Sequence, residues 1–388
     1  MFMKKKTYMD YAATTPVDKR VLKAMLPFFS EKFGNTMSLH SFGQEAKEAL
    51  EESRVVVAGL MNALPEEIIF TASATESNNL SMKGAAFANK NKGNHIIISA
   101  IEHHCVLESA EWLGKQGFEI TKLKVDKYGL IDLTELEKEI KKETILVSIM
   151  HANNEIGTVE PIEEIGKICH EKGVLFHTDA AQSLGKIPID VKKMNIDLLT
   201  GSSQKMYGPK GAACLFIRKG VKIEPMLHGG GHEFGLRPST INLPAIVGFA
   251  KACNICRKEM IYEGARISKL RNELIGGVLK NIPDALLNGH PEKRLPNNAN
   301  FWFKFVEGES LVFQLDFSCI AASTGSACSS AQLTASHVLL ALGLKPEQAH
   351  GSLRLTLGRW TKEKDVKYVL KVLPEIIKKL REISPFKK

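Results

Sequence analysis

Short apolar runs alternate with amphipathic stretches through the first half of the chain. Five runs are nearly continuous in β-branched and other apolar residues: HIIIS (95–99), TILVSIM (144–150), VLFHTD (174–179), IDLLT (196–200) and ACLFI (213–217). Such runs are typical of strands buried on both faces of a sheet. The periodicity between them predicts helices at 45–62, 78–92, 105–116, 132–142 and 162–172. This alternation predicts an α/β fold with a mostly parallel, doubly wound sheet.

The pattern changes after a loop rich in glycine and proline, HGGGHEFGLRPSTINLP at 228–244. A long helical stretch follows at about 245–280, and shorter strands and helices continue to the end of the chain. We therefore expect two domains. The large α/β domain is predicted over 14–250, and a smaller α+β domain over 1–13 and 251–388.

Composition narrows the class of protein. The 388 residues are 44% hydrophobic, enough for a large core, and the formal net charge is +9. No basic block is interleaved with aromatic residues, so we expect no direct nucleic-acid contact and favour an acidic partner or an anionic ligand. No apolar run reaches the ~18 residues that a membrane span needs. Seven scattered cysteines, an odd number, do not form a disulfide framework, and we expect a cytoplasmic protein.

Polar residues follow several of the predicted strands. Asp179 ends the strand 174–179, Gln182 lies one helical turn further, and Lys205 follows the strand 196–200. TASATESNNL (71–80) places hydroxyl groups where a helix begins. Each feature alone is explained by a loop charge, an N-cap or a capping box. Together they supply an amine for a Schiff base, an acid for a ring nitrogen and a helix N-terminus for a phosphate, the parts of a pyridoxal-phosphate site.

Two cysteine motifs need separate interpretation. Cys328 is the only thiol in ASTGSACSS, a loop of small residues, whereas the other cysteines lie in apolar or helical surroundings. From the residues alone, a nucleophile and an ordinary loop thiol both remain open for Cys328. CNIC (253–256) has the spacing of a redox or metal pair, but it lies inside the long helical stretch without a partner pair. We interpret CNIC as helix packing.

Nine motifs together resemble the cysteine desulfurases of the NifS/IscS type. In chain order they are YMDYAATTPVD, TASATESNNL, EHHCV, MHANNEIGT, HTDAAQSLGK, SSQKMYGPKG, HGGGHE, STGSACSS and HGSLRLTLGR, and they cover essentially the whole chain. The resemblance implies the aspartate-aminotransferase-like fold, fold type I of the pyridoxal-phosphate enzymes, and a homodimer with active sites at the subunit interface. It further implies conversion of L-cysteine to L-alanine. The sulfur would pass as a persulfide on Cys328 to an acceptor such as an iron–sulfur cluster scaffold or a thiolation enzyme.

The resemblance also implies a role for each matching residue. Lys205 would hold the cofactor and move protons, His103 would stack on the cofactor and act as acid and base, and Cys328 would be the nucleophile. The residues that would contact the cofactor are Ala74, Thr75, His103, Asn154, Asp179, Gln182, Ser202, Ser203, Gln204 and Lys205, with Thr240 from the neighbouring subunit. Asn35 and Arg354 would bind the substrate carboxylate, for which a bidentate guanidinium is suited. Arg359 is expected to be structural.

The chain departs from the family at Gln204, where histidine is usual, and Gln204 cannot carry a charge. Two other functions stay open. One is a different pyridoxal-phosphate enzyme of this fold, such as a selenocysteine lyase or an aminotransferase. The other is a non-catalytic scaffold partner whose Cys328 ligates a shared iron–sulfur cluster, although the presence of both Lys205 and Arg354 argues against it.

Overall fold

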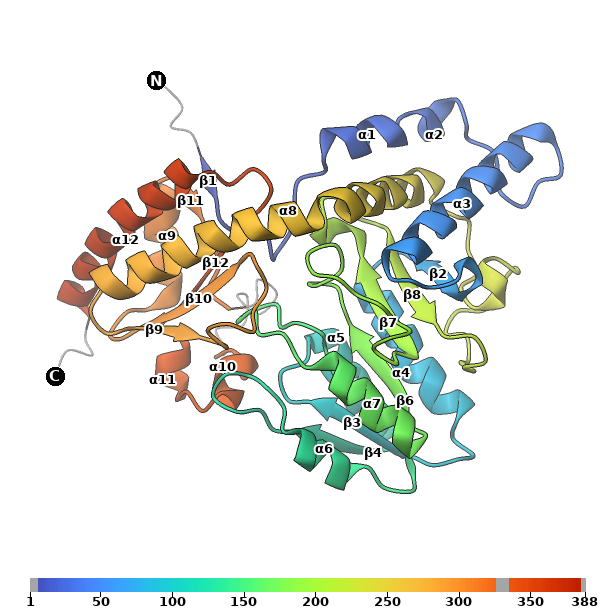
Figure 1. The fold of residues 1–388 in the computed structure, drawn as a ribbon, viewed down its shortest axis with the longest axis horizontal. Helices are drawn as coiled ribbons and strands as arrows, with labels where there is room; N and C mark the ends of the chain where they lie inside the picture. The colour runs from blue at the N-terminus through green and yellow to red at the C-terminus, as the bar shows by residue number, and fades with distance from the viewer. Residues whose placement is uncertain (1–5, 326–334, 385–388) are drawn as a thin grey trace.

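A seven-stranded sheet forms the centre of the larger part of the molecule (Figure 1). The structure is a computed structural model that describes residues 6–325 and 335–384. The sheet has the order β2-β8-β7-β6-β5-β3-β4. Its strands are β2 (Ile68–Thr71), β3 (His95–Ser99), β4 (Glu119–Leu123), β5 (Thr144–Ser148), β6 (Leu175–Asp179), β7 (Leu198–Ser202) and β8 (Ala213–Ile217). Only β8 runs antiparallel to its neighbours, so the predicted mostly parallel sheet is confirmed.

Helices cover both faces of this sheet. Along β3, Ile96 and Ile98 pack into one apolar core while Ile97 packs into the other, because successive strand side chains point to opposite faces. The helices of this part are α1 (Lys19–Met25), α2 (Pro27–Ser30), α3 (Ser41–Leu60), α4 (Ala74–Ala88), α5 (His104–Lys115), α6 (Leu133–Glu139) and α7 (Ile162–Lys172). Burial on both faces explains why β3 and the four other predicted strands read as unbroken apolar runs.

A second, antiparallel sheet organises the smaller part, in the order β12-β10-β9. A two-stranded parallel sheet joins the start of the chain to it. The strands are β1 (Thr7–Tyr8), β9 (Ala285–Asn288), β10 (Asn298–Phe303), β11 (Ile320–Ala321) and β12 (Ser352–Thr356). The helices are α9 (Gly308–Phe317), α10 (His337–Ala341), α11 (Pro346–Ala349) and α12 (Glu363–Ile383). This mixture is the α+β arrangement that the sequence predicts for the end of the chain.

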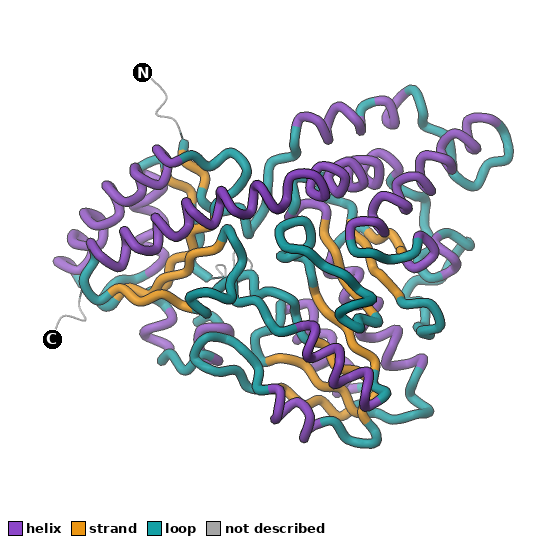
Figure 2. Tube along the Cα trace, viewed as in Figure 1, coloured by secondary structure: helices purple, strands orange, loops and turns teal. Residues whose placement is uncertain are grey.

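One long helix, α8 (Leu243–Asn281), belongs to both parts (Figure 2). Its 39 residues span roughly 58 Å. Cys253 and Cys256 pack in the core of the large sheet, whereas Leu270 and Leu274 pack in the core of the small one. The interpretation of CNIC as helix packing is therefore confirmed, and the large core extends past residue 250. Among the described residues, no helix combines the length and the apolarity needed to cross a bilayer.

A buried ion pair anchors the glycine-rich loop 228–244 to the large sheet. Arg54 of α3 donates to both carboxylate oxygens of Glu233 at 2.8 Å, and the Phe70 amide donates to the same carboxylate at 2.7 Å. Glu233 and Phe234 have φ of 48° and 56°, in the left-handed region that costs free energy for residues other than glycine. The hydrogen bonds and the guanidinium, 5.2 Å from the Phe234 ring, stabilise this conformation.

We predict that Glu233→Ala lowers the free energy of unfolding by about 3–5 kcal/mol, because it removes the buried carboxylate that pairs with Arg54 and leaves this buried cation only the exposed Glu51 as an ion-pair partner. The measurement is urea unfolding followed by circular dichroism. Glu45→Ala is the control, since Glu45 pairs with Lys32 on the surface and its loss should leave the unfolding free energy nearly unchanged. Equal stability of the two variants would contradict the anchoring role of Glu233.

Candidate functional site

A cavity of about 250 Å³ lies at the carboxyl ends of the parallel strands. This edge is where open α/β sheets bind ligands, since the loops after several strands meet there. The lining residues are Ala12, Ala13, Ser73, Ala74, Thr75, His103, Cys105, Met150, Ala152, Asn154, Asp179, Ala181, Gln182, Ser202, Gln204, Lys205 and Arg354. The structure thus brings together most of the residues that the sequence singles out.

The start of the chain crosses the cavity and contacts Lys205. The Lys205 Nζ donates to the carbonyl oxygens of Ala12 and Ala13, at 2.8 and 2.6 Å. The hydroxyl of Thr14 donates to Oε1 of Gln204 at 3.2 Å, which turns the amide nitrogen of Gln204 away from Thr14. Ala12 and Ala13 both lie in YMDYAATTPVD but were not predicted as site residues. Every residue type has the same backbone carbonyl, so the sequence does not indicate which carbonyl acts as an acceptor.

Asp179 is held in one orientation from both sides. Its side chain is buried at the end of β6, where one oxygen accepts from Asn78 Nδ2 at 2.7 Å and the other from the Ala181 amide at 2.8 Å. Asn78 lies in the second turn of α4. It lies inside TASATESNNL and was not predicted as a site residue. The packing of α4 brings the side-chain amide of Asn78 next to the Asp179 carboxylate, and the sequence motif does not show this contact.

His103 caps α5 and lies beside a buried thiol. Its Nδ1 accepts from the Cys105 amide at 3.2 Å, so the proton of a neutral ring belongs on Nε2. Burial lowers the pKa of His103 from its ordinary value of 6.5, and the nearby Asp179 carboxylate opposes that shift. Burial also raises the pKa of Cys105 to about 12. Near neutral pH the cavity therefore contains a neutral imidazole, able to accept a proton, and a protonated thiol.

Arg354 reaches the cavity from β12 of the small sheet and is 2% exposed. Its Nη1 donates to the Asn154 carbonyl at 2.9 Å, and its Nη2 donates to Asp10 at 3.0 Å. Among the described residues nothing accepts a hydrogen bond from its Nε, which is buried. A buried donor without an acceptor costs free energy, so an anionic ligand that supplies one is stabilised here.

These groups fit pyridoxal phosphate together with an amino acid. Ala74 and Thr75 form the first turn of α4, a 15-residue helix whose N-terminus attracts a phosphate. Lys205 provides the amine, Asp179 an acceptor for a ring nitrogen, and Arg354 a donor for a carboxylate.

Three of the predicted residues that the structure describes do not line this cavity. Ser203 is buried, Thr240 is exposed, and Asn35 lies on an exposed loop where its Oδ1 accepts from the Met37 amide at 2.9 Å. Their predicted contacts stay predictions, and Thr240 was expected to act in a neighbouring subunit. Cys328, with its predicted roles as nucleophile and cluster ligand, lies outside the described residues.

The described residues on either side of 326–334 contact the site. Ser323 pairs with Arg354 through backbone hydrogen bonds of 2.7 and 3.3 Å. Gly325 approaches Glu155 so closely that a Cβ there would lie 2.5 Å from Oε2. Ser336 donates to the same oxygen at 2.5 Å. Both ends of the segment that contains Cys328 are therefore tied to residues next to Asn154 and Arg354.

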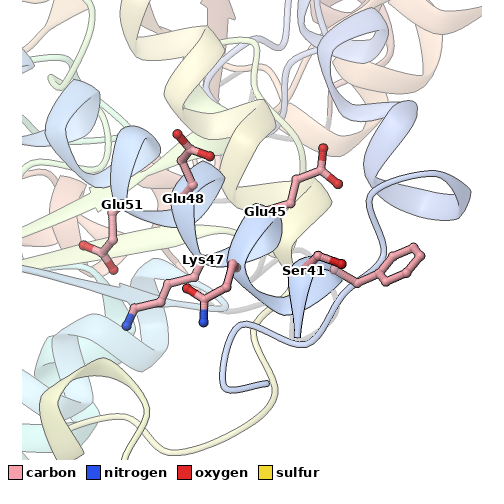
Figure 3. Close-up of a pocket in the computed structure, with 7 residues that line it drawn as sticks. Ser41, Glu45, Lys47, Glu48 and Glu51 are labelled. Atoms are coloured by element: carbon pink, nitrogen blue, oxygen red, sulfur yellow. The ribbon is translucent and has the colours of Figure 1, made fainter. Parts of the chain in front are cut away.

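A larger hollow, of about 810 Å³, lies on the outer side of α3 (Figure 3). Its lining comes from this one helix: Ser41, Phe42, Gln44, Glu45, Lys47, Glu48 and Glu51. It joins no distant parts of the chain and is the solvated face of a helix. The smaller cavity, with buried charged side chains from both the large and the small sheet, is the candidate site.

Comparisons with known proteins agree with this choice. The pattern of the aminotransferase class-V family matches residues 7–369. The chain is 53% identical over 378 residues to the cysteine desulfurase IscS 1 of Archaeoglobus fulgidus, covering 97% of this chain and 98% of that protein. Among solved structures, a NifS-like protein superposes with a TM-score of 0.91 at 39% identity, over 96% of this chain and 100% of that one. SspA in complex with cysteine superposes with a TM-score of 0.80 at 38% identity, over 91% and 99%.

We predict that five buried cysteines resist alkylation in the folded protein. Burial raises the pKa of four of these thiols to about 12 and that of Cys253 well above its ordinary value, so little thiolate forms. They are Cys105, Cys169, Cys214, Cys253 and Cys256. Iodoacetamide labelling near neutral pH, followed by peptide mass spectrometry, should modify Cys328 first and these five only after unfolding. Native labelling of any of them at the rate of Cys328 would contradict the prediction.

Proposed function

The chain belongs to the aminotransferase class-V family, and we propose that it is a pyridoxal-phosphate-dependent cysteine desulfurase that converts L-cysteine to L-alanine. The observation that carries the proposal is the meeting of Lys205, Asp179 and Arg354 in one cavity. It is supported by 52% identity over 385 residues to the cysteine desulfurase IscS of Dictyoglomus turgidum, covering 99% of this chain. A cavity with an amine, an acid and a guanidinium suits an amino-acid substrate on this cofactor.

Pyridoxal phosphate, when bound, withdraws electrons from the bonds at the substrate α-carbon. Lys205 holds it covalently through Nζ and moves a proton at that carbon. Asp179, fixed by Asn78 and the Ala181 amide, accepts a hydrogen bond from the ring nitrogen. The residues proposed to hold the phosphate are Ala74, Thr75, Ser202, Ser203 and Gln204, joined by Thr240 of a second subunit. Those proposed to contact the ring are His103, Asn154 and Gln182.

The substrate is held by its carboxylate and attacked at its sulfur. Arg354, assisted by Asn35, binds the carboxylate. The Cys328 thiolate attacks the substrate sulfur; as the new S–S bond forms, the C–S bond breaks and its electron pair stays with the substrate carbon, which takes a proton to become alanine. His103, neutral near pH 7 and at the cavity wall, accepts the proton of the substrate thiol. The contacts of Ser323 with Arg354 and of Ser336 with Glu155, the neighbour of Asn154, support Cys328 as the nucleophile.

A second copy of this chain completes the enzyme. Residues before and at the start of α3 expose a set of large apolar side chains, each at least 53% exposed: Leu26, Phe29, Phe33, Met37, Leu39 and Phe42. Exposed apolar area of this kind is typical of an interface, and a homodimer covers it. Asn35 lies within the same stretch and Thr240 is also exposed, which supports contacts across the interface.

The persulfide on Cys328 is passed to an acceptor protein, an iron–sulfur cluster scaffold or a thiolation enzyme. Transfer to such partners requires a reducing compartment in which thiols stay reduced, such as the cytoplasm. The six described cysteines support this location, since all of them are free thiols.

Two variants test the proposal by separating its two chemical groups. Wild-type protein should be yellow, release alanine from L-cysteine and carry an added sulfur atom on Cys328 in mass spectra. Cys328→Ser should keep the yellow cofactor but release no alanine, because a serine hydroxyl is hardly ionised. Lys205→Ala should lose both the borohydride-stable attachment of the cofactor and turnover. Alanine release by Cys328→Ser at the wild-type rate, or a wild type that does not bind pyridoxal phosphate, would overturn the proposal.

Gln204 gives a second prediction, on cofactor affinity. Its amide oxygen faces Thr14, which leaves the amide nitrogen to donate to the phosphate. Gln204→Ala should weaken pyridoxal-phosphate binding by about 1–3 kcal/mol, the cost of a lost hydrogen bond to a charged acceptor. The measurement is an absorbance titration of the apoprotein. Gln204→His, which installs another donor, is the matched variant and should retain wild-type affinity; unchanged binding by Gln204→Ala would contradict the role.

A further inference from the structure

Lys186 lies behind the cavity wall that Gln182 forms. Its amine donates to the backbone carbonyl of Gln182 at 2.8 Å and to the side-chain oxygen of the same residue at 3.1 Å. The other end of the Gln182 amide donates to the Ala12 carbonyl at 3.0 Å. Ala12 in turn accepts from Lys205 at 2.8 Å. A continuous chain of hydrogen bonds therefore runs from Lys186 to the amine of Lys205.

The chemistry of these groups allows one orientation of the Gln182 amide. A lysine ammonium has only donors and a backbone carbonyl only acceptors. A flipped amide would place its oxygen against the Ala12 carbonyl, which is repulsive whatever the charge of Lys186, and its NH₂ group against the Lys186 amine, which is repulsive when that amine is protonated. The amide nitrogen of Gln182 is consequently kept at the cavity side, and its oxygen at the side of Lys186.

The surroundings of the Lys186 amine are unusual for a positively charged group. On its far side it lines a small cavity of about 20 Å³ with Tyr207 and Glu263, against α8. Glu263 is paired with Arg359 at 2.9 Å, and no carboxylate pairs with Lys186 among the residues that the structure describes. Burial and the nearby Lys205 cation lower the pKa of Lys186 to about 7. This amine is partly buried, and its partial desolvation costs free energy that no ion pair offsets.

We propose that Lys186 is a positioning residue of the cofactor site, which holds the amide of Gln182 so that its nitrogen donates into the cavity. It touches neither cofactor nor substrate and acts through Gln182. The inference rests on the proposed function, since it assigns Gln182 as a donor to pyridoxal phosphate.

The test is a titration of apoprotein with pyridoxal phosphate, followed by visible absorbance. Lys186→Met keeps the long side chain without its donors and should weaken binding about tenfold, as expected for a hydrogen-bonded group released from its partner. Lys192→Met removes an exposed lysine six residues further on and serves as the matched control, with wild-type affinity expected. Thermal unfolding of the apoproteins checks that each variant folds. Lys186→Ala replaces Lys186→Met if the latter does not fold.

A double-mutant cycle with Gln182→Leu separates positioning from a merely structural role. If Lys186 acts through Gln182, the Lys186 substitution should weaken binding less than about twofold once Gln182 is already leucine. The inference would be overturned if the Lys186 substitution weakened binding by the same factor with and without Gln182→Leu. Wild-type affinity in the folded Lys186 variant would also overturn it.

Independent effects in the cycle, or wild-type affinity of the Lys186 variant, would overturn only the role of Lys186. The proposed function would stand as long as the wild-type protein binds the cofactor and releases alanine. A wild type that does neither overturns the proposed function itself.

Discussion

The carbonyl oxygens of Ala12 and Ala13 form the contact on which the site depends, because they hold the amine of Lys205 at the wall of the cavity. The segment that carries them leaves the small sheet, where β1 pairs with β11, and passes between the two parts of the molecule. Asp10 pairs with Arg354, and the Ala12 amide donates to Thr356 of β12. The same short segment therefore contacts Lys205 of the large part and Arg354 of the small part.

The two parts contribute different charged groups to the cavity. Asp179 and Lys205 follow strands of the large sheet, while Arg354 lies on the small sheet, whose backbone also pairs with Ser323 on the way to Cys328. The continuous helix α8 packs in both apolar cores and so connects the large part rigidly to the small one. A substrate held by its carboxylate on one side and reacting on the other needs such a fixed distance, since catalysis depends on orientation.

Burial divides the cysteines by reactivity. The thiol of Cys105 lines the cavity, yet its raised pKa keeps it protonated and its sulfur accepts from Asn78 at 3.0 Å. Cys253 and Cys256 are likewise buried in α8. A sulfur-transfer enzyme gains from this division, because a second ionised thiol near the substrate would compete for the persulfide.

The sequence by itself determined five of the seven strands of the large sheet and the groups at their ends, Asp179, Gln182 and Lys205, that line the cavity. Strands buried on both faces must be apolar throughout, so β3, β5, β6, β7 and β8 were readable, and the polar residues at their ends indicated where a ligand binds. β4, half exposed at the sheet edge, and the four-residue β2 left no such run. Only the tertiary structure decided the contacts of Ala12, Asn78 and Lys186, because they depend on which backbone and side-chain groups meet across long sequence separations. A carbonyl acceptor is the same in every residue type, so its position in the fold, and not its identity, gives it a role.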